Sequence, residues 1–314
     1  MTSRKAVNPI DFDKAKELFL YLSPATSNWT GPRPEPVLYR GHWSAKWDLV
    51  PTALRKPNWL TDGAAWHEVP LSTTWEQVRA EVATLKYFFE ESDRQGLRLP
   101  EDGQTLRQEF QRIENVLEEG KLQYYAHFWP SSPLMSLLGL AQHCGIATRL
   151  LDWSWDPYVA AYFAASGILR TDRAPAAEDR IAIWMLLLAI VETQSYLHGN
   201  EPKEWPVRVI TAPTADNANL RAQRGVFTLH NIIRYKPTQP PEAPSMDDVL
   251  NANLAKSVDP DPPAALTRLT LPASEAPELL FLLSRQGYHR ASLFPGFEGV
   301  ADLLGERRKL QGKP

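Results

Sequence analysis

The sequence contains almost no cysteine: Cys144 is the only one in 314 residues. An intrachain disulfide is therefore excluded, and a reducing compartment suits the chain. Zinc sites usually need several Cys and His ligands, and no HxxxH pair compensates for the missing cysteines, so we expect no metal. A Cys-His nucleophilic pair is not expected either, because His143 and Cys144 are neighbours whose side chains would point about 100° apart on a helix.

Long apolar runs and blocks of like charge are also missing. The most apolar run, residues 181–191, is too short to span a bilayer as a helix. The formal net charge is −3, and no five or six like charges follow one another. Neither a basic tail for nucleic acid nor a polybasic membrane anchor is therefore predicted. The first residues lack the continuous apolar core of a signal peptide. These absences predict a cytoplasmic protein without a membrane partner.

Three common catalytic motifs do not occur. Without GxxxxGK[ST] there is no P-loop, and without GxGxxG after a strand there is no Rossmann fingerprint. The absence of GxSxG argues against an α/β-hydrolase nucleophile. The chemistry must therefore come from less standard clusters of polar residues.

The apolar periodicity predicts both helices and strands. Helical spacing, with caps or prolines at several starts, covers residues 11–22, 73–95, 103–119, 133–145, 156–169, 276–286 and 300–310. Alternating or continuous apolar runs predict strands over residues 37–41, 180–190, 207–210, 226–229 and 265–271. This mixture predicts an α+β fold. The helices within 73–119 are expected to form an insertion that serves as a lid, as a partner surface or only in packing.

Polar side chains gather between two predicted helices, in residues 141–165. This stretch reads AQHCGIATRLLDWSWDPYVAAYFAA and holds more polar and aromatic groups than a connection requires. We therefore expect a loop that carries a site, with Asp152 among its polar candidates. Arg40 is a second candidate, because it ends strand 37–41 and a buried guanidinium needs an anion or several acceptors. A third group, with Gln223, lies just before strand 226–229.

Each candidate also has a structural interpretation. Arg40 can pair with a structural carboxylate instead of holding a phosphate or ribose. Asp152 can cap a helix or pair with Arg149. Gln223 can make a structural hydrogen bond, and Trp153 can belong to the core. The residues alone leave these alternatives open.

The order of these motifs resembles the FRG domain family. That family has a Phe/Tyr-Arg-Gly motif, then Trp-x-Leu-x-Pro, AQHxGxxTRLLDW, DPxxAAxFA, a segment with Asn, Arg and Gln, and LFPxxxG. The matching segments here are residues 39–41, 47–51, 141–153, 156–164, 219–227 and 293–299. The resemblance implies an FRG domain over residues 37–305, with a helical insertion at about 72–120 and a proline-rich one at about 236–263. An N-terminal helix and proline-rich lead-in, 1–36, and a C-terminal tail, 306–314, would flank it.

The motif order of this family is in turn similar to the layout of ADP-ribosyltransferases. That similarity implies a split mixed or antiparallel sheet with surrounding helices, and NAD as a substrate. Arg40 would hold the NAD phosphate or ribose, and Asp152 would supply a carboxylate. Gln223 would stand where many transferases have a catalytic Glu, although an amide is no general base. The residues implied to bind NAD are Tyr39, Arg40, Gly41, His143, Thr148, Arg149, Trp153 and Ser154.

The resemblance thus implies an NAD-dependent ADP-ribosyltransferase, acting as a toxin or anti-phage effector. Its acceptor would be RNA, DNA or a protein, and an antitoxin or regulatory protein is a possible further partner. Two other classes of function stay open. One is a non-catalytic module that binds a nucleotide or a partner protein. The other is a metal-dependent hydrolase or nuclease using Asp152, against which the shortage of clustered carboxylates counts.

Overall fold

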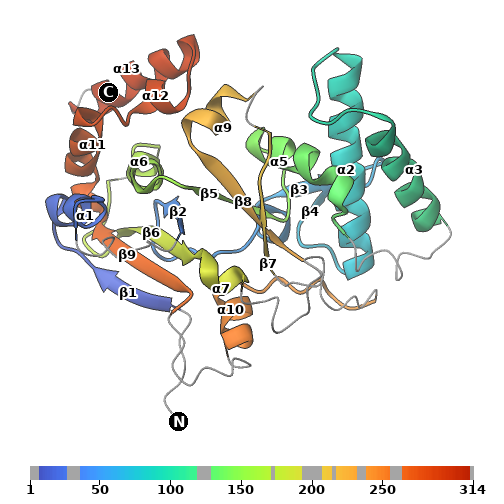
Figure 1. Cartoon of the computed structure of the whole chain (residues 1–314), viewed down its shortest axis with the longest axis horizontal. Helices are drawn as coiled ribbons and strands as arrows, with labels where there is room; N and C mark the ends of the chain where they lie inside the picture. The colour runs from blue at the N-terminus through green and yellow to red at the C-terminus, as the bar shows by residue number, and fades with distance from the viewer. Residues whose placement is uncertain are drawn as a thin grey trace.

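The computed structural model describes residues 7–26, 36–118, 129–170, 174–192, 207–213, 217–231, 238–254 and 264–311 (Figure 1). Several predicted segments lie partly outside these residues. They are the lead-in at 1–6 and 27–35, the end of the helical insertion at 119–120, the proline-rich insertion at 236–237 and 255–263, and the tail at 312–314. The described residues form both helices and strands, which confirms the predicted α+β class.

A seven-stranded sheet runs through the fold (Figure 1). Its strands lie in the order β1-β9-β6-β2-β5-β8-β7, and among the described pairs only β1 and β9 are parallel. Their bounds are β1 Val7–Asp11, β2 Val37–His42, β5 Leu150–Ser154, β6 Arg180–Leu187, β7 Val207–Ile210, β8 Gly225–His230 and β9 Leu266–Pro272. A separate hairpin consists of β3 Trp59–Thr61 and β4 Trp66–Glu68. The sheet is therefore mixed, with mostly antiparallel neighbours.

The sheet divides in its middle, between β2 and β5. These two strands share one register pair, Tyr39 with Ser154. By contrast, β2 pairs with β6 along its whole length, and so does β5 with β8. Past the single pair the two strands have no further ladder partners on each other, so backbone groups there need other hydrogen-bond partners.

Helices cover both faces of the sheet (Figure 1). Their bounds are α1 Ala15–Tyr21, α2 Thr74–Arg94, α3 Gln104–Glu118, α5 Met135–His143, α6 Pro157–Ile168, α7 Leu188–Glu192, α9 Ala218–Ala222, α10 Met246–Leu254, α11 Ala276–Arg285, α12 Arg290–Leu293 and α13 Phe297–Leu310. On one face, α1, α6 and α11 pack over β9, β6 and β2, and α2, α3 and α5 pack over β5 and β8. On the other face, α7 and α10 pack against Leu38, Trp153 and Trp184.

The slim helix α6 approaches β2 very closely. It begins with Asp156 as its N-cap and Pro157 in its first turn, as predicted. A Cβ added to Gly41 would lie 2.0 Å from the carbonyl oxygen of Ala160 and 2.6 Å from the backbone nitrogen of Ala164. Glycine is therefore required at this position of the Tyr-Arg-Gly motif because the helix backbone occupies the space of a side chain.

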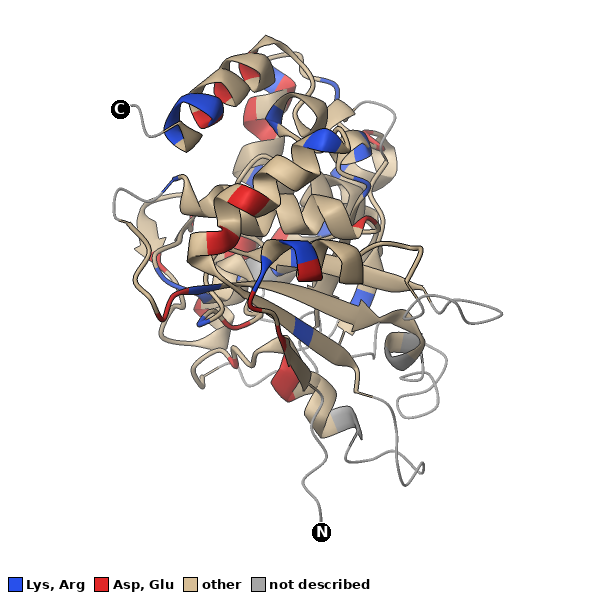
Figure 2. Ribbon diagram, turned by 90° about the vertical axis from the view of Figure 1, so that its left-hand side faces the viewer, with Lys and Arg blue, Asp and Glu red and all other residues tan. Residues whose placement is uncertain are grey.

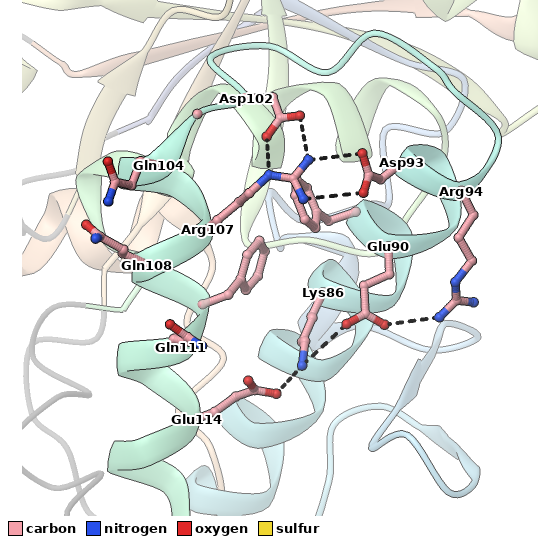
Figure 3. Close-up of a pocket in the computed structure, with 13 residues that line it drawn as sticks. Lys86, Glu90, Asp93, Arg94, Asp102, Gln104, Arg107, Gln108, Gln111 and Glu114 are labelled. Atoms are coloured by element: carbon pink, nitrogen blue, oxygen red, sulfur yellow. Dashed lines mark hydrogen bonds and ion pairs between the residues drawn. The ribbon is translucent and has the colours of Figure 1, made fainter.

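The predicted helical insertion consists of α2 and α3, which lie together at one side of the molecule (Figure 1). A groove of about 870 Å³ lies between them. Two of its cations are paired across the helices: Arg107 of α3 bonds Asp93 of α2 and also Asp102, and Lys86 of α2 pairs with Glu114 of α3 (Figure 3). These ion pairs hold α3 on α2 and balance most of the groove's own charge.

Three sequence predictions need correction. Residue 11 does not cap the first helix: Asp11 ends strand β1 and accepts a hydrogen bond from Thr270 Oγ1 at 2.6 Å, and α1 starts later. The stretch 141–165 is not a loop throughout, because β5 lies inside it and pairs with two strands. The last helix begins at Phe297 rather than at residue 300.

Charged side chains of both signs are interspersed over the helices, whereas the strands carry few (Figure 2). The main exception is the last turn of α13, where Arg307, Arg308 and Lys309 follow one another. Cations at this end of a helix oppose the negative pole of its dipole. None of the described helices is both long and apolar enough to cross a membrane.

The close approach of α6 predicts a strong effect of Gly41→Ala. We expect the free energy of unfolding to fall by about 3 kcal/mol, because the new methyl group meets backbone atoms that cannot rotate away. Urea denaturation followed by circular dichroism measures this change. The matched control is Gly305→Ala in α13, where a Cβ would meet nothing within 4 Å. That variant should be stabilised by up to about 1 kcal/mol, through helix propensity. Equal stabilities of the two variants would contradict the argument.

Candidate functional site

Arg40 fills the division between β2 and β5. Its Nη1 donates to the backbone carbonyl of Asp152 at 2.6 Å and lies 3.4 Å from the carboxylate atom Oδ2. Its Nε donates to Nε2 of His42 at 2.9 Å. Only 11% of the Arg40 side chain is exposed. Burial lowers the pKa of Arg40 from its ordinary value, and the Asp152 carboxylate opposes that shift.

The two residues meet even though they start on opposite faces of the sheet. Arg40 follows Tyr39, and Asp152 lies two residues from Ser154, the register partner of Tyr39. Because side chains alternate along a strand, Asp152 projects from the face of Tyr39, and Arg40 from the other face. Their contact is possible because the ladder is interrupted between them.

Asp152 is held on one oxygen and is otherwise accessible. Its side chain is 52% exposed. Gln142 Nε2 donates to Oδ2 at 2.9 Å, and Gln142 Oε1 accepts from Thr148 Oγ1 at 2.5 Å. Thr148 is buried and is fixed in turn by Thr52, whose Oγ1 accepts from its backbone N–H at 3.1 Å. This relay leaves the Oδ1 atom of Asp152 without a hydrogen bond from the part of the chain that the structure describes.

Two histidines adjoin this pair. Burial, followed by the neighbouring Arg40 and Arg55 guanidiniums, holds the pKa of His42 well below its ordinary value. His42 is therefore neutral at pH 7, and its Nε2 lone pair can accept from Arg40. Burial also lowers the pKa of His143, while the nearby Asp152 carboxylate raises it. His143 thus lies beside Asp152 as a mainly neutral, half-buried ring.

Four of the residues expected to bind NAD make contacts within the fold. Tyr39 is buried among α1, α6 and α11, and Trp153 is buried on the opposite face, with its Nε1 donating to Thr228 Oγ1 at 2.9 Å. Ser154 Oγ accepts from the backbone N–H of Asp156 at 2.9 Å and donates to the backbone carbonyl of Gln223 at 2.7 Å. Gly41 faces α6, as described above.

Arg149 belongs to a buried network rather than to the Asp152 cluster. Its Nε donates to Glu81 Oε2 of α2 at 2.6 Å, and both side chains are 4% exposed. The same oxygen accepts from Trp129 Nε1 at 2.8 Å, and Glu81 Oε1 accepts from Gln77 at 2.8 Å. The suggested Asp152–Arg149 ion pair is therefore wrong: Asp152 pairs with Arg40, and Arg149 pairs with Glu81.

The side-chain amide of Gln223 contacts neither Arg40 nor Asp152 in the described structure, although its backbone carbonyl accepts from Ser154 Oγ. Gln223 ends α9, and its Nε2 donates to the carbonyl of Leu293 in α12 at 3.0 Å. This bond is the only one its side-chain amide makes within the described chain. Of the three predicted catalytic residues, the structure thus brings Arg40 and Asp152 into contact and directs the third to α12.

The cluster contains residues that the sequence did not single out. Gln142 lies inside the long central motif, but its contact with Asp152 depends on how α5 packs beside β5. The proximity of His42 to Arg40 could have been predicted from the sequence, because residues 40 and 42 share a face of one strand. Arg55 had no signal in the sequence: it follows a 3-10 helix, Thr52–Leu54, whose position depends on contacts with Thr148. Within the described residues no three His, Cys, Asp or Glu gather into a possible metal site.

Comparison with protein families identifies part of this chain. Residues 35–173 match the family model described as the FRG domain. The chain contains an FRG domain. No curated protein and no solved structure matches the chain. The matched range holds Arg40, Gln142 and Asp152, whereas strands β1, β6, β7, β8 and β9 lie outside it and complete the same sheet.

The buried contact of Arg149 predicts a structural role. Arg149→Ala should lower the free energy of unfolding by about 3–5 kcal/mol, because the Glu81 carboxylate would stay buried without its counter-ion. Chemical denaturation measures this loss. Arg285→Ala, at an exposed position of α11, serves as the control and should change stability by less than about 0.5 kcal/mol. A stable Arg149→Ala protein would refute the structural role.

A second buried group predicts loss of stability in acid. Burial, and next the Arg149 guanidinium, lower the pKa of His230 to about 3. The unfolded chain protonates this residue near pH 6.5, so unfolding should become easier by about 1.4 kcal/mol per pH unit below about 6.5. His230→Leu should remove that part of the slope. Urea denaturation between pH 7 and pH 5 tests it, and an unchanged slope in the variant would count against it.

Proposed function

We propose that this FRG-domain protein is an NAD-dependent ADP-ribosyltransferase whose reaction takes place at the division between β2 and β5. The observation that carries the proposal is the contact of a strand-end arginine, Arg40, with the half-exposed carboxylate of Asp152. The division of the sheet also agrees with the split sheet that the similarity to ADP-ribosyltransferases implied. In this proposal NAD is a substrate and no metal is needed.

The chemistry requires a carboxylate that is held in position and has one oxygen accessible to the ribose. The bond from the ribose C1 atom to the nicotinamide nitrogen breaks, and its electron pair leaves with nicotinamide. The ribose then carries an oxocarbenium-like positive charge, which a neighbouring carboxylate stabilises. The free Oδ1 of Asp152 suits this role, because Gln142 and Arg40 both contact Oδ2. A lone pair of the acceptor forms the new bond to C1, and Asp152 is the base we propose for the released proton.

Arg40 and His143 have supporting roles in this proposal. The Arg40 guanidinium binds the phosphate or ribose of NAD through Nη2, because its Nε and Nη1 contact His42 and Asp152. The half-buried ring of His143, beside Asp152, forms part of the wall against nicotinamide. We assign the catalytic carboxylate to Asp152 rather than a catalytic role to Gln223, because the Gln223 amide is bound to Leu293.

The biological setting is proposed on the resemblance alone. The acceptor would be RNA, DNA or a protein, and the protein would act in the cytoplasm as a toxin or anti-phage effector. An antitoxin or regulatory protein would then control it. Modification of a cell extract with labelled NAD, followed by nuclease or protease digestion, distinguishes these acceptor classes.

A non-catalytic nucleotide-binding module is the second candidate. It is favoured by the same hydrogen bonds: Asp152 Oδ2 is already shared by two donors, and the Gln223 amide donates to Leu293. A module of this kind binds NAD or a related nucleotide without releasing nicotinamide. The two candidates therefore differ in turnover and not in affinity.

The decisive assay is nicotinamide release from NAD, with and without cell extract. Asp152→Asn should lower the rate about 100-fold or more while leaving NAD affinity within a few-fold, because an amide cannot stabilise the charge on the ribose. Arg40→Ala should instead weaken NAD binding. Arg285→Ala is the control variant and should act as the unmodified protein does. Binding without release under every condition would replace the transferase proposal with the nucleotide-binding module.

A further inference from the structure

Arg55 places a second guanidinium beside Arg40. It follows the 3-10 helix Thr52–Leu54, which is anchored at both of its first residues: Thr52 Oγ1 accepts from the backbone N–H of Thr148 at 3.1 Å, and the N–H of Ala53 donates to the Thr148 carbonyl at 3.0 Å. Thr148 also donates to Gln142, which holds Asp152. The segment before Arg55 is thereby fixed against the Arg40–Asp152 cluster.

The half-buried Arg55 interacts electrostatically with its neighbours. Burial lowers its pKa most, the Arg40 guanidinium lowers it further, and the Asp152 carboxylate raises it. Arg55 also acts on His42. Arg40 and His42 lie on β2 and Asp152 lies on β5, and the residues before Arg55 are hydrogen-bonded to Thr148 of the same cluster, so Arg55 lies close to it.

The charges of this cluster do not balance. Arg40 and Arg55 contribute two positive charges and Asp152 contributes one negative charge, while His42 stays neutral. Two guanidiniums that are partly removed from water repel one another unless a further anion joins them. The excess of one positive charge therefore calls for an anion from outside.

Hydrogen-bond donors are available for that anion. Arg40 uses Nε and Nη1 in contacts with His42 and Asp152, and its Nη2 has no partner in the described chain. The guanidinium of Arg55 donates no hydrogen bond to any described residue. Two guanidinium groups with free donors in one cluster match the oxygens of a diphosphate, which accepts several charge-assisted hydrogen bonds at once.

We propose that Arg55 is a second anion-binding residue and that, together with Arg40, it binds the diphosphate group of a dinucleotide. The proposal rests on the proposed function only for the source of that diphosphate, which is NAD. Inorganic pyrophosphate and ADP-ribose share the chemistry and therefore serve as probes. Arg55 does not touch the reacting carbon in this arrangement; it fixes the end of the substrate remote from nicotinamide.

A structural role for Arg55 makes a different prediction. If Arg55 only reinforces Asp152, its removal destabilises the protein with no ligand present. If it awaits an anion, its removal relieves repulsion with Arg40 and leaves the ligand-free protein as stable as before, or more so. Thermal unfolding without any added anion thus separates the two roles.

The test uses the full chain with Arg55→Gln, and with Arg55→Lys, which keeps the charge but loses the fork of donors. Titration calorimetry measures binding of pyrophosphate and ADP-ribose, with adenosine as a ligand that lacks the diphosphate. Arg94→Gln removes an exposed arginine of α2 and is the matched control. We expect Arg55→Gln to weaken both diphosphate ligands roughly tenfold or more, Arg55→Lys to weaken them less, and the control to leave them unchanged.

The outcomes separate this inference from the transferase proposal. Arg55-dependent binding of ADP-ribose without nicotinamide release supports the anion site and rejects the transferase. Nicotinamide release that is insensitive to Arg55→Gln, at NAD concentrations below saturation, overturns the anion site and leaves the transferase. Unchanged affinities in Arg55→Gln, or a lower unfolding temperature of its ligand-free form, also overturn it. If the protein binds pyrophosphate but not ADP-ribose, Arg40 and Arg55 bind a free anion, and the proposal of a dinucleotide ligand is overturned.

Discussion

The hydrogen bond from Arg40 to the backbone carbonyl of Asp152 joins two halves of a sheet that its own ladder barely connects. Between β2 and β5 only Tyr39 and Ser154 are register partners. Past that pair the Arg40 side chain, in place of a backbone N–H of β2, donates the hydrogen bond to the Asp152 carbonyl. The group that closes the sheet is also the group that the proposed chemistry offers to a ligand. Arg40 therefore links the connection between the two halves of the sheet to ligand binding at the site.

The central motif of the FRG domain has a mainly structural content. Within it, Gln142, Thr148 and Arg149 are engaged with Asp152, Thr52 and Glu81. Only a few of its polar atoms remain open, chiefly on the carboxylate of Asp152. The length and specificity of the motif then follow from the number of residues that must be held in place around the exposed carboxylate of Asp152. Many residues of such a motif are needed to position the site, and only a few take part in its chemistry.

Local patterns predicted the elements well and the partners poorly. Strand β2, predicted over residues 37–41, and the Asp-Pro start of α6 followed from alternation and capping, which depend on near neighbours in the chain. The hidden strand β5 did not, because its polar residues mask the apolar alternation of Leu151 and Trp153. The contacts of Arg149 with Glu81, and of Gln223 with Leu293, span about 70 residues and depend on the packing of whole layers. No spacing rule along the chain contains that information.

The position of Glu81 bears on how the insertion of α2 and α3 is related to the rest of the fold. Its carboxylate neutralises Arg149 at the start of β5 and accepts from Trp129, and the adjacent Gln77 donates to the carbonyl of Ala53 at 2.8 Å. A helix tied in this way cannot swing as a lid, since any displacement would separate buried charges. For the same reason α2 is an integral part of the fold: removing it would leave the buried guanidinium of Arg149 without its carboxylate partner.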